Sequence, residues 1–443
     1  MNYKIRYIAQ LCNEDTDEIL EEQLIQTKSL QFPKSFQEFG LRHAEQIALI
    51  KKSQDFTLKY QVEYFNQSEC PNCKKKLRKQ GQITSDFHDI LTDHKIQIQR
   101  LTCTCGWKNK NTLNGIYGNA CHPELLEQQA KMGANTSFEK ASQILNGFSA
   151  EKRNINNDVT IMRNVTKVGS SLDAYKKSKS WAEPEEAASE LVVVTDGGHV
   201  QDKSDGKHTF EELISTVYSP EDITYKKDGG QVIDGKLSVG SAKSDQLRSI
   251  QQLTLNACKH LGMTKDTSVT ALTDGAQNCW SVINNLGSSC KQLIRILDWF
   301  HIGKKFKERE SKVPEELKEI YDKAKWHCWH GHPKTSVIRL TEVRHGLESA
   351  LAIEKVDELI TYINNNSLYI INYHARRLKG LPFSSQLAES SVNSIINERQ
   401  KNKKMQWTRE GAHNILQIRT SLFSKRWKED WQNISNDIYK TAA

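Results

Sequence analysis

The chain has 443 residues, of which 37% are apolar, and a formal net charge of +8. This length exceeds one ordinary hydrophobic core, so we expect a folded, soluble, cytoplasmic protein of two or three domains. No run of about 18 apolar residues occurs, and the first residues lack a basic segment followed by an apolar one, so membrane insertion and secretion are not expected. The net charge is too small to identify a partner, whereas its distribution along the chain is informative.

Residues 1–66 are predicted to be helical, with LRHAEQIALIKK as their most periodic part. Residues 67–120 follow directly and carry four of the ten cysteines, namely Cys70, Cys73, Cys103 and Cys105. A CxxC pair followed by a CxC pair predicts a structural zinc site of four thiolates in a zinc-ribbon-like domain. The segment between the pairs ends in IQIQRLTC, whose alternation is typical of a strand.

The zinc-ribbon-like domain leaves two alternatives open. The second cysteine pair has one intervening residue where two are usual, so a histidine is an alternative ligand, with His88, His94 and His122 as choices. The domain is also basic, because residues 70–110 contain nine Lys or Arg against three Asp or Glu. We predict DNA contacts from the cations beside the first pair, with a solvated basic face as the alternative: Lys74, Lys75, Lys76, Arg78 and Lys79.

Residues 121–184 are predicted to form a helical DNA-binding region with breaks at Gly133, Gly147 and Gly169. Two of its helices, at about residues 137–146 and 154–168, have the spacing of a helix-turn-helix motif. The second helix would then direct Arg163, Asn164 and Lys167 toward a DNA groove, and an ordinary helical pair is the alternative. The polar stretch KKSKSWAEPEEAASE marks a domain boundary near residue 185.

Beyond residue 185, strands and helices alternate. Three strand-like segments are followed by helix, strand, helix and strand, in the order LVVVTDG, ELISTVYSP, VIDGKLSVGSA, residues 244–262, TSVTALTDG, CWSVINNL and KQLIRILDWFH. This order predicts that residues 185–443 form an α/β domain with the mixed sheet of a ribonuclease-H-like fold. Residues 304–380 are charged, periodic and poor in strand signals, so we expect them to be an all-helical insertion.

Three acidic residues are candidates for a catalytic metal site in this domain. Asp196 and Asp274 each end a β-branched apolar run and precede Gly, so they are expected at the edge of the sheet where open α/β folds bind ligands. Glu389 lies after the helical insertion, in a predicted helix that could pack back on the sheet. Clustered carboxylates favour hard cations such as Mg²⁺, and two such ions catalyse phosphodiester exchange. For each aspartate alone, a structural turn is an equal alternative.

Two further features of the domain bear on its function. Asp298 and His301, in ILDWFH, compete for a place in the site, although a packed histidine is the simpler interpretation. The basic carboxyl-terminal block combines cations with an aromatic ring, which favours contacts to a DNA backbone, with solvation and core packing as the alternatives. The residues proposed for these contacts are Arg399, Lys401, Lys403, Lys404, Trp407 and Arg409.

Several long blocks resemble one family. TDGG, ALTDGAQNCWSVI, ILDWFHIGKKF, LAESSVNSIINERQK and MQWTREGAHNILQIRTSL are similar to blocks of bacterial insertion-sequence DDE transposases, most closely the ISKra-type family. The resemblance extends over nearly the whole chain, because that family also has amino-terminal cysteine knuckles and a helical DNA-binding region. It implies a ribonuclease-H-like domain in which Asp196, Asp274 and Glu389 hold two Mg²⁺ or Mn²⁺ ions.

The resemblance also implies an activity and partners. The protein would bind the terminal inverted repeats of its own element in double-stranded DNA, hydrolyse the DNA at the ends and transfer the strands to target DNA. It would act on the bacterial nucleoid, without a membrane partner, and at least as a dimer on paired ends. Two alternatives are a ribonuclease-H-like nuclease that cuts without joining and a domesticated DNA-binding protein that has lost the chemistry.

Overall fold

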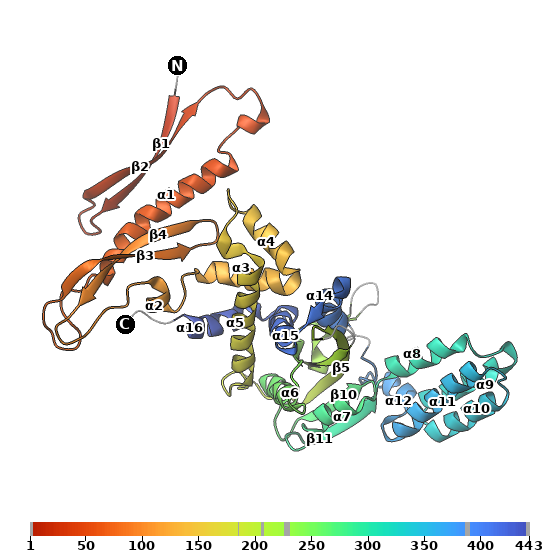
Figure 1. Ribbon diagram of the computed structural model, residues 1–443. Coiled ribbons are helices and arrows are strands. Elements are labelled where there is room, and N and C mark those ends of the chain that lie inside the picture. The colour runs from red at the N-terminus through yellow and green to blue at the C-terminus, as the bar shows by residue number, and fades with distance from the viewer. Residues whose placement is uncertain (1–2, 185, 205–207, 226–230, 386–389, 440–443) are drawn as a thin grey trace. The chain divides into compact units, whose positions relative to one another are not determined.

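The computed structural model describes residues 3–184, 186–204, 208–225, 231–385 and 390–439 (Figure 1). The chain divides into two compact units, Met1–Val168 with Trp431–Ala443 and Gly169–Asp430. The largest hydrophobic core lies in the second unit, and smaller apolar clusters lie in the first. Within the described residues, every helix is too short or too polar to cross a lipid bilayer.

A β-hairpin opens the first unit, where a helix was expected. Its strands are β1 (Tyr3–Cys12) and β2 (Ile19–Leu30), joined by a turn in which the Asn13 side chain accepts two backbone hydrogen bonds. The elements that follow are η1 (Phe36–Glu38), α1 (His43–Gln61) and η2 (Val62–Phe65). The helical prediction is wrong for residues 3–30, because Tyr7, Ala9 and Leu11 are half-buried with the period of two that a strand has.

The rest of the first unit consists of a second hairpin and a group of helices. Its elements are β3 (Arg78–His88), β4 (Asp93–Thr102), α2 (Leu113–Tyr117), α3 (Pro123–Asn135), α4 (Phe138–Gly147), η3 (Asn154–Asn156) and α5 (Asp158–Lys177), which continues into the second unit. Residues 148–157 connect α4 to α5. A helix-turn-helix motif has a turn of about three or four residues, so the prediction of that motif for this pair is wrong.

The connection between α4 and α5 is fixed to the turn between β3 and β4 by one arginine. The buried Arg153 guanidinium donates to the Asp93 carboxylate and to the backbone oxygens of Asp89, Ile90 and Thr92, at 2.5 to 3.1 Å. Burial raises the pKa of Asp93, but hydrogen bonds that include those from Arg153 outweigh it and hold this pKa well below its usual range. Arg153 therefore joins the hairpin and the helices into one body.

Two of the glycines expected to break helices lie inside them instead. A Cβ atom on Gly133 of α3 would lie 2.7 Å from the Val165 side chain of α5. A Cβ atom on Gly169 of α5 would lie 2.5 Å from the backbone oxygen of Asn414. Both positions require glycine because a neighbouring segment approaches closely, and this requirement outweighs the low helix propensity of glycine. Gly147 does end a helix, as expected.

The second unit is built on a mixed sheet, which confirms the expected α/β class. Its strands are β5 (Glu190–Asp202), β6 (Thr209–Tyr218), β9 (Leu237–Ser241), β10 (Ser268–Thr273), β11 (Gln292–Leu297) and β12 (Gln406–Trp407), with a separate pair of β7 (Ile223–Tyr225) and β8 (Gln231–Ile233). The strand order is β11-β10-β5-β6-β9. β10 is parallel to both of its neighbours, β5 and β11. β6 is antiparallel to both of its neighbours, β5 and β9, and β12 pairs in parallel with the end of β5.

The remaining elements of the second unit are helical, and the last of them, α16, continues into the first unit. They are η4 (Pro220–Asp222), α6 (Arg248–His260), α7 (Gln277–Asn284), α8 (Trp299–Glu310), α9 (Glu315–Trp329), α10 (Pro333–His345), α11 (Ala350–Asn365), η5 (Ser367–Tyr369), α12 (Tyr373–Leu378), α13 (Ser390–Val392), the π-helix η6 (Asn393–Asn397), α14 (Glu398–Gln400), η7 (Asn402–Lys404), α15 (Arg409–Phe423) and α16 (Trp427–Ile438). Elements α8 to α12 are helical throughout, as the strand-poor composition of residues 304–380 predicts.

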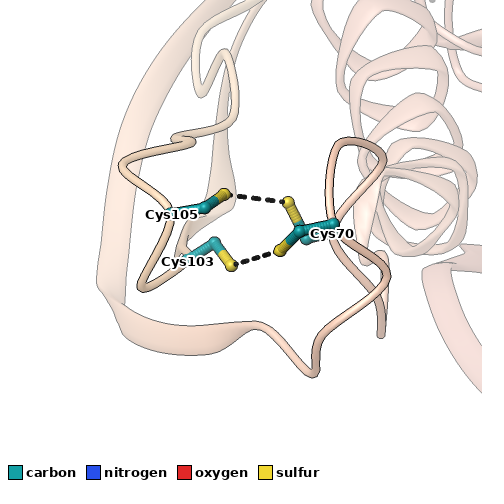
Figure 2. Close-up of side chains that lie close together, drawn as sticks. Cys70, Cys103 and Cys105 are labelled. Carbon is teal, nitrogen blue, oxygen red and sulfur yellow. Dashed lines mark hydrogen bonds between the residues drawn. The ribbon is translucent and has the colours of Figure 1, made fainter.

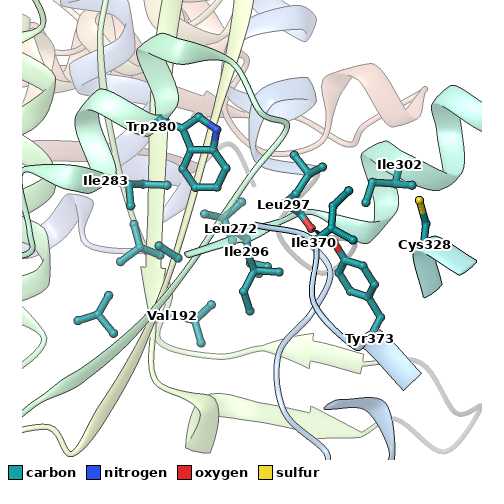
Figure 3. Packing of buried hydrophobic residues seen from close by; sticks show 14 of the residues in the cluster. Val192, Leu272, Trp280, Ile283, Ile296, Leu297, Ile302, Cys328, Ile370 and Tyr373 are labelled. Atoms are coloured by element: carbon teal, nitrogen blue, oxygen red, sulfur yellow. Dashed lines mark hydrogen bonds between the residues drawn. The ribbon is translucent and has the colours of Figure 1, made fainter. Parts of the chain in front are cut away.

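The sheet and the helices from α8 to α12 share one hydrophobic core. Leu272 of β10 and Ile296 of β11 lie near Trp280 of α7, and the same cluster extends to Ile302 of α8 and Tyr373 of α12 (Figure 3). The buried Tyr373 hydroxyl donates a 2.7 Å hydrogen bond to the last carbonyl of β11, at Leu297. The helical segment is therefore packed onto the sheet at the carboxyl ends of its parallel strands.

The close approach at Gly169 gives a stability prediction. Gly169→Ala should lower the free energy of unfolding by about 1–3 kcal/mol, because the added methyl group overlaps the backbone of α15. The matched control is Gly303→Ala in α8, where an added Cβ meets nothing within 4 Å. That variant should be neutral or more stable by up to about 1 kcal/mol. Urea denaturation followed by circular dichroism measures both, and equal effects would contradict the packing.

Candidate metal centres

The first cysteine pair lies in a tight turn before β3. The backbone N–H of Lys74 donates to the Cys70 oxygen, and the N–H of Cys70 donates to the Lys75 oxygen, both at 2.9 Å. Lys74 adopts a left-handed conformation with φ of 61°. This turn holds both thiols of the pair, Cys70 and Cys73, on one side of the chain, as a metal-binding knuckle requires.

The second pair forms a similar turn after β4. The N–H of Cys103 donates to the Trp107 oxygen, and the N–H of Gly106 donates back to the Cys103 oxygen. Gly106 has φ of 91°, a conformation that side chains disfavour. The glycine lets the chain turn immediately after Cys105, so the short CxC spacing still directs both sulfurs inward.

The four thiols converge, which confirms the prediction that they form one cluster (Figure 2). The Sγ atoms of Cys70 and Cys105 are 3.6 Å apart, and those of Cys73 and Cys103 are 3.4 Å apart. All four ligand atoms lie within 4.8 Å of one another. A tetrahedral zinc ion with Zn–S bonds of about 2.3 Å would need sulfurs about 3.8 Å apart. The cluster could therefore bind a metal ion such as zinc, and its four thiolates would leave no open position for catalysis.

The four thiols share protons. The backbone N–H of Cys105 and the neighbouring thiols lower the pKa of Cys103 to about 6, whereas those thiols raise the pKa of Cys105 to about 12. Cys103 therefore ionises first and its neighbour keeps a proton until a cation compensates the second charge. The three histidines considered as alternative ligands have other partners. His88 contacts Asp93, His94 contacts Asp55, Asp89 and Thr92, and His122 caps α3. The five neighbouring cations are all exposed: Lys74, Lys75, Lys76, Arg78 and Lys79.

A second group of acids lies where the parallel strands β10 and β11 end, beside the middle of β5. The expectation that Asp196 ends its strand is wrong, because pairing with β6 continues β5 beyond it to Asp202. Thr195 of β5 pairs with Thr273 of β10, which pairs in turn with Leu297 of β11. Asp196, Asp274 and Asp298 are the next residues along these three strands. Since the strands are parallel and in register, the aspartates stand at the same level of the sheet. Two of the three are the aspartates that the sequence predicts for the catalytic site.

Asp196 and Asp274 are half-buried and held by local hydrogen bonds. The Asp196 carboxylate accepts a 2.7 Å hydrogen bond from the Gly197 N–H, and burial together with the charges of Asp274 and Asp298 raises its pKa. The Asp274 carboxylate accepts from the Ala276 N–H at 2.9 Å. The turn after Asp274 requires glycine, because Gly275 has φ of 98° and the Asn366 side chain approaches within 2.9 Å of its Cβ position.

Asp298 differs from the other two aspartates because its carboxylate is fully buried and already bonded. One oxygen accepts from the N–H groups of Phe300, at the start of α8, and Ser385, at 3.1 and 2.8 Å. The other oxygen accepts from the Ser385 hydroxyl and lies 3.6 Å from the His301 ring. Asp298 thus caps α8 and anchors Ser385, whereas Asp196 and Asp274 keep oxygens that no local donor uses among the described residues.

The third predicted acid, Glu389, lies outside the described residues. Among those described, the cysteines are the only set of three or more His, Cys, Asp or Glu side chains close enough to share a metal ion. Residues 386–389 are outside the described part, and a described residue on each side of them is bonded within the second unit. Ser385 is bonded to Asp298, and the Ser391 hydroxyl accepts a 3.2 Å hydrogen bond from Thr216 of β6.

The carboxyl-terminal basic block divides into buried and exposed members. Arg399 is 2% exposed, stacks over the buried Trp407 ring at 4.7 Å and has a pKa that burial lowers to about 10. These two side chains stabilise the fold, so the prediction that they contact DNA is wrong for the structure as it stands. Lys401, Lys404 and Arg409 are exposed. Lys403 belongs to η7, but its side chain lies outside the described part.

The predicted groove-facing residues of α5 also divide. Arg163 is exposed, whereas Lys167 is half-buried, and burial lowers its pKa. Asn164 points toward α3, where its amide donates to the Gln129 side chain. Of these three residues, therefore, only Arg163 is exposed for contact with another molecule.

Sequence reasoning missed one buried acid on the sheet. Glu212 of β6 is 0% exposed, and neither of its carboxyl oxygens has a hydrogen-bond partner among the described residues. Burial raises the pKa of Glu212 to about 8, although Gln400 and Lys401 oppose the shift. The signal was available, because Glu212 shares the face of Phe210 and Ile214 in FEELISTVY and both of those are apolar.

Comparison with known proteins adds no family. No protein-family model matches the sequence. No curated protein matches it either. The function of the two candidate centres must therefore be argued from their residues.

The cysteine cluster predicts a bound metal. Full-length protein purified without chelators should contain about one zinc ion per chain, and Cys70→Ser should lose most of it because three thiolates bind less tightly than four. Cys12→Ser, which changes an exposed thiol in β1, is the control and should keep its zinc. Mass spectrometry of the metal content measures both. Full zinc in Cys70→Ser would contradict the site.

Glu212 predicts a pH dependence of stability. Its pKa of about 8 in the folded chain exceeds the unfolded value of about 4.3, so its contribution is present below the unfolded pKa and is lost as pH rises through about 8. Glu212→Gln should therefore raise the free energy of unfolding at about pH 9 by up to about 5 kcal/mol, with little change near pH 4. Glu211→Gln, at the neighbouring half-buried position, is the control. Denaturation at several pH values would exclude the assignment if both variants behaved alike.

Proposed function

We propose that this chain is a DDE transposase of a bacterial insertion sequence, which cuts DNA at the inverted-repeat ends of its element and joins them to target DNA. The observation that carries the proposal is the parallel register of β5 and β10, which brings Asp196 and Asp274 to one level of the same sheet. In open α/β sheets, ligands bind at the carboxyl ends of the parallel strands. Two adjacent carboxylates there suit a hard divalent cation.

The sheet order supports a ribonuclease-H-like domain. Numbered along the chain, the main strands are β5, β6, β9, β10 and β11, and they lie in the order third, second, first, fourth, fifth. The first three are antiparallel, and the last two are parallel to the first. The order of these elements along the chain, three strands followed by helix, strand, helix and strand, is the one that the sequence analysis expects of a ribonuclease-H-like domain. The first strand, β5, is central and carries Asp196.

Glu389 completes the proposed set of acids. The anchors on either side of it support its inclusion, because Ser385 is bonded to Asp298 at the end of β11 and Ser391 is bonded to Thr216 of β6. Thr216 pairs with Val194, two residues before Asp196. The described residues Ser385 and Ser391, which precede and follow Glu389 in the chain, are thus each bonded to a residue of the second unit. Asp298 has a positioning role in this scheme, since both of its oxygens are bonded within the protein.

The proposed chemistry depends on cations held by the three acidic residues and on the negative charge of the phosphodiester. Two Mg²⁺ ions bound by Asp196, Asp274 and Glu389 would neutralise the phosphodiester and lower the pKa of an attacking water or 3′-hydroxyl. Asp196 lies on the central strand and would be shared by both ions. Its raised pKa means that protons compete for this ligand, so the bound cations would hold it ionised. No Ser, Tyr or Cys nucleophile is required.

DNA would be held by cations outside this site. Lys74, Lys75, Lys76, Arg78 and Lys79 form one exposed basic segment beside the cysteine cluster. Lys401, Lys404 and Arg409 form another in the second unit, and Arg163 adds a cation on α5. Such contacts neutralise phosphates and give affinity that falls with rising salt. Backbone contacts of this kind position a duplex without identifying its sequence.

The proposal predicts loss of DNA chemistry in Asp196→Asn. The substrate is a duplex that carries the DNA flanking the coding region, where inverted repeats would lie, mixed with plasmid target and Mg²⁺. Asp196→Asn should cut at least about a hundredfold more slowly than wild type while it binds DNA equally well, because an inner metal ligand is lost. Denaturing gels measure cleavage, and the joined plasmid product measures strand transfer.

The matched control is Asp266→Asn, an exposed turn residue before the amino end of β10, opposite the edge that carries Asp274. It should cut at the wild-type rate. Mg²⁺ should be omitted rather than chelated in blank reactions, so that the cysteine cluster keeps its metal. Wild-type cleavage by Asp196→Asn would refute the proposal. Cleavage without any joined product would favour a nuclease of the same fold.

A further inference from the structure

The amino-terminal hairpin has two outer strand edges, of which that of β1 is the more regular. Within the described residues, β1 and β2 form a sheet of two strands, so each strand has a partner on one side. Both irregularities of the pair lie in β2, where the register skips Ile25 and Leu20. β1 from Lys4 to Cys12 is therefore regular, whereas bulges interrupt β2. A regular open edge is a template for another strand, and bulges protect against such pairing.

The side chains of β1 are unusually apolar for an open edge. Ile5 and Ile8 are 42% and 45% exposed. The polar contacts that fasten the hairpin to α1 are made by β2: Lys59 with Glu21, Lys28 with Glu45, and Lys52 with the Ile25 oxygen. These contacts hold the hairpin in place while the far edge of β1 keeps its backbone groups available. An isolated pair of strands is marginally stable and gains most from added strands.

We propose that β1 pairs antiparallel with β1 of a second copy of this chain, with the twofold axis at Ile8, to form a four-stranded sheet. This register sets Ile8 against Ile8 of the partner, Ile5 against Leu11, and Tyr7 against Ala9. It sets the basic residues against neutral ones, because Lys4 faces Cys12 and Arg6 faces Gln10. Directly opposed side chains lie about 4.5–5.5 Å apart, so apolar pairs stabilise the contact and like charges destabilise it.

Other arrangements of two copies are less favourable. A parallel, in-register pair would oppose Lys4 to Lys4 and Arg6 to Arg6. An antiparallel pair centred on Ile5 would oppose Lys4 to Arg6. The register centred on Ile8 also keeps faces matched, since the half-buried Tyr7 and Ala9 meet each other and the half-buried Leu11 meets Ile5, which lies on the same face of the strand. This self-complementarity favours a second copy over an unrelated strand. The inference depends on the hairpin alone and not on the proposed DNA chemistry.

The test is the association state of the full-length protein without DNA. Sedimentation velocity at increasing concentration should show a monomer–dimer equilibrium for wild type. Ile8→Lys and Ile8→Glu should each weaken dimerisation by at least about tenfold, or about 1.4 kcal/mol, because like charges meet at the axis. An equimolar mixture of the two variants should regain dimers, since Lys then faces Glu. Recovery in the mixture also proves that both variants fold.

The control is Leu24→Lys. Leu24 is the partner of Ile8 within the hairpin and is exposed to a similar degree, at 54% against 45%, but it lies on β2, away from the outer edge of β1. This variant should dimerise like wild type. A monomeric wild type, a dimer that Ile8→Lys leaves unchanged, a mixture that stays monomeric, or equal weakening by Leu24→Lys would each overturn the proposal.

Discussion

The register of the parallel strands is the constraint on which the second unit depends. Because Thr195, Thr273 and Leu297 lie side by side, the residue after each stands at the same level of the sheet, and in all three cases it is an aspartate. Burial is the main cause of the raised pKa of Asp196, and the negative charges of Asp274 and Asp298 add to it. The three carboxylates are compensated differently. Asp298 is bonded within the protein, whereas Asp196 and Asp274 retain capacity for an external cation.

The sequence was most informative where one kind of pattern determines one structure. The β-branched runs before Asp196 and Asp274 are short and apolar, so both strands could be predicted, and the strand before Asp274 ends at Thr273 as expected. The predicted strand end at Asp196 is wrong, because pairing with β6 and β12 continues β5 to Asp202. Cysteine spacing likewise predicted the thiol cluster, because two pairs of closely spaced cysteines are typical of a structural zinc site. In both cases the chemistry of the residues is local. Gly106 even explains how the shorter second pair succeeds.

Prediction failed where one residue type has two structural roles and tertiary packing determines which of them it takes. Arg399 and Trp407 look like a basic and aromatic DNA-binding pair, but each is buried against the other. Glycines in α3 and α5 look like helix breakers, although they admit close neighbours. The hairpin at residues 3–30 was missed because its alternation is interrupted by the bulges of β2. None of these outcomes can be obtained from composition or period alone.

Arg153 bears on the distance between two basic sites of the first unit, and so on how a nucleic-acid duplex would bind to both. Its hydrogen bonds join the β3–β4 turn to the connection before α5, and the cysteine knuckles lie at the opposite end of the same hairpin. The basic segment that follows Cys73 and the exposed Arg163 on α5 are therefore attached to a single stiff frame. The distance between these two basic sites is therefore fixed. If a duplex bound to both sites, this distance would determine the spacing, along the duplex, of the phosphates that they contact.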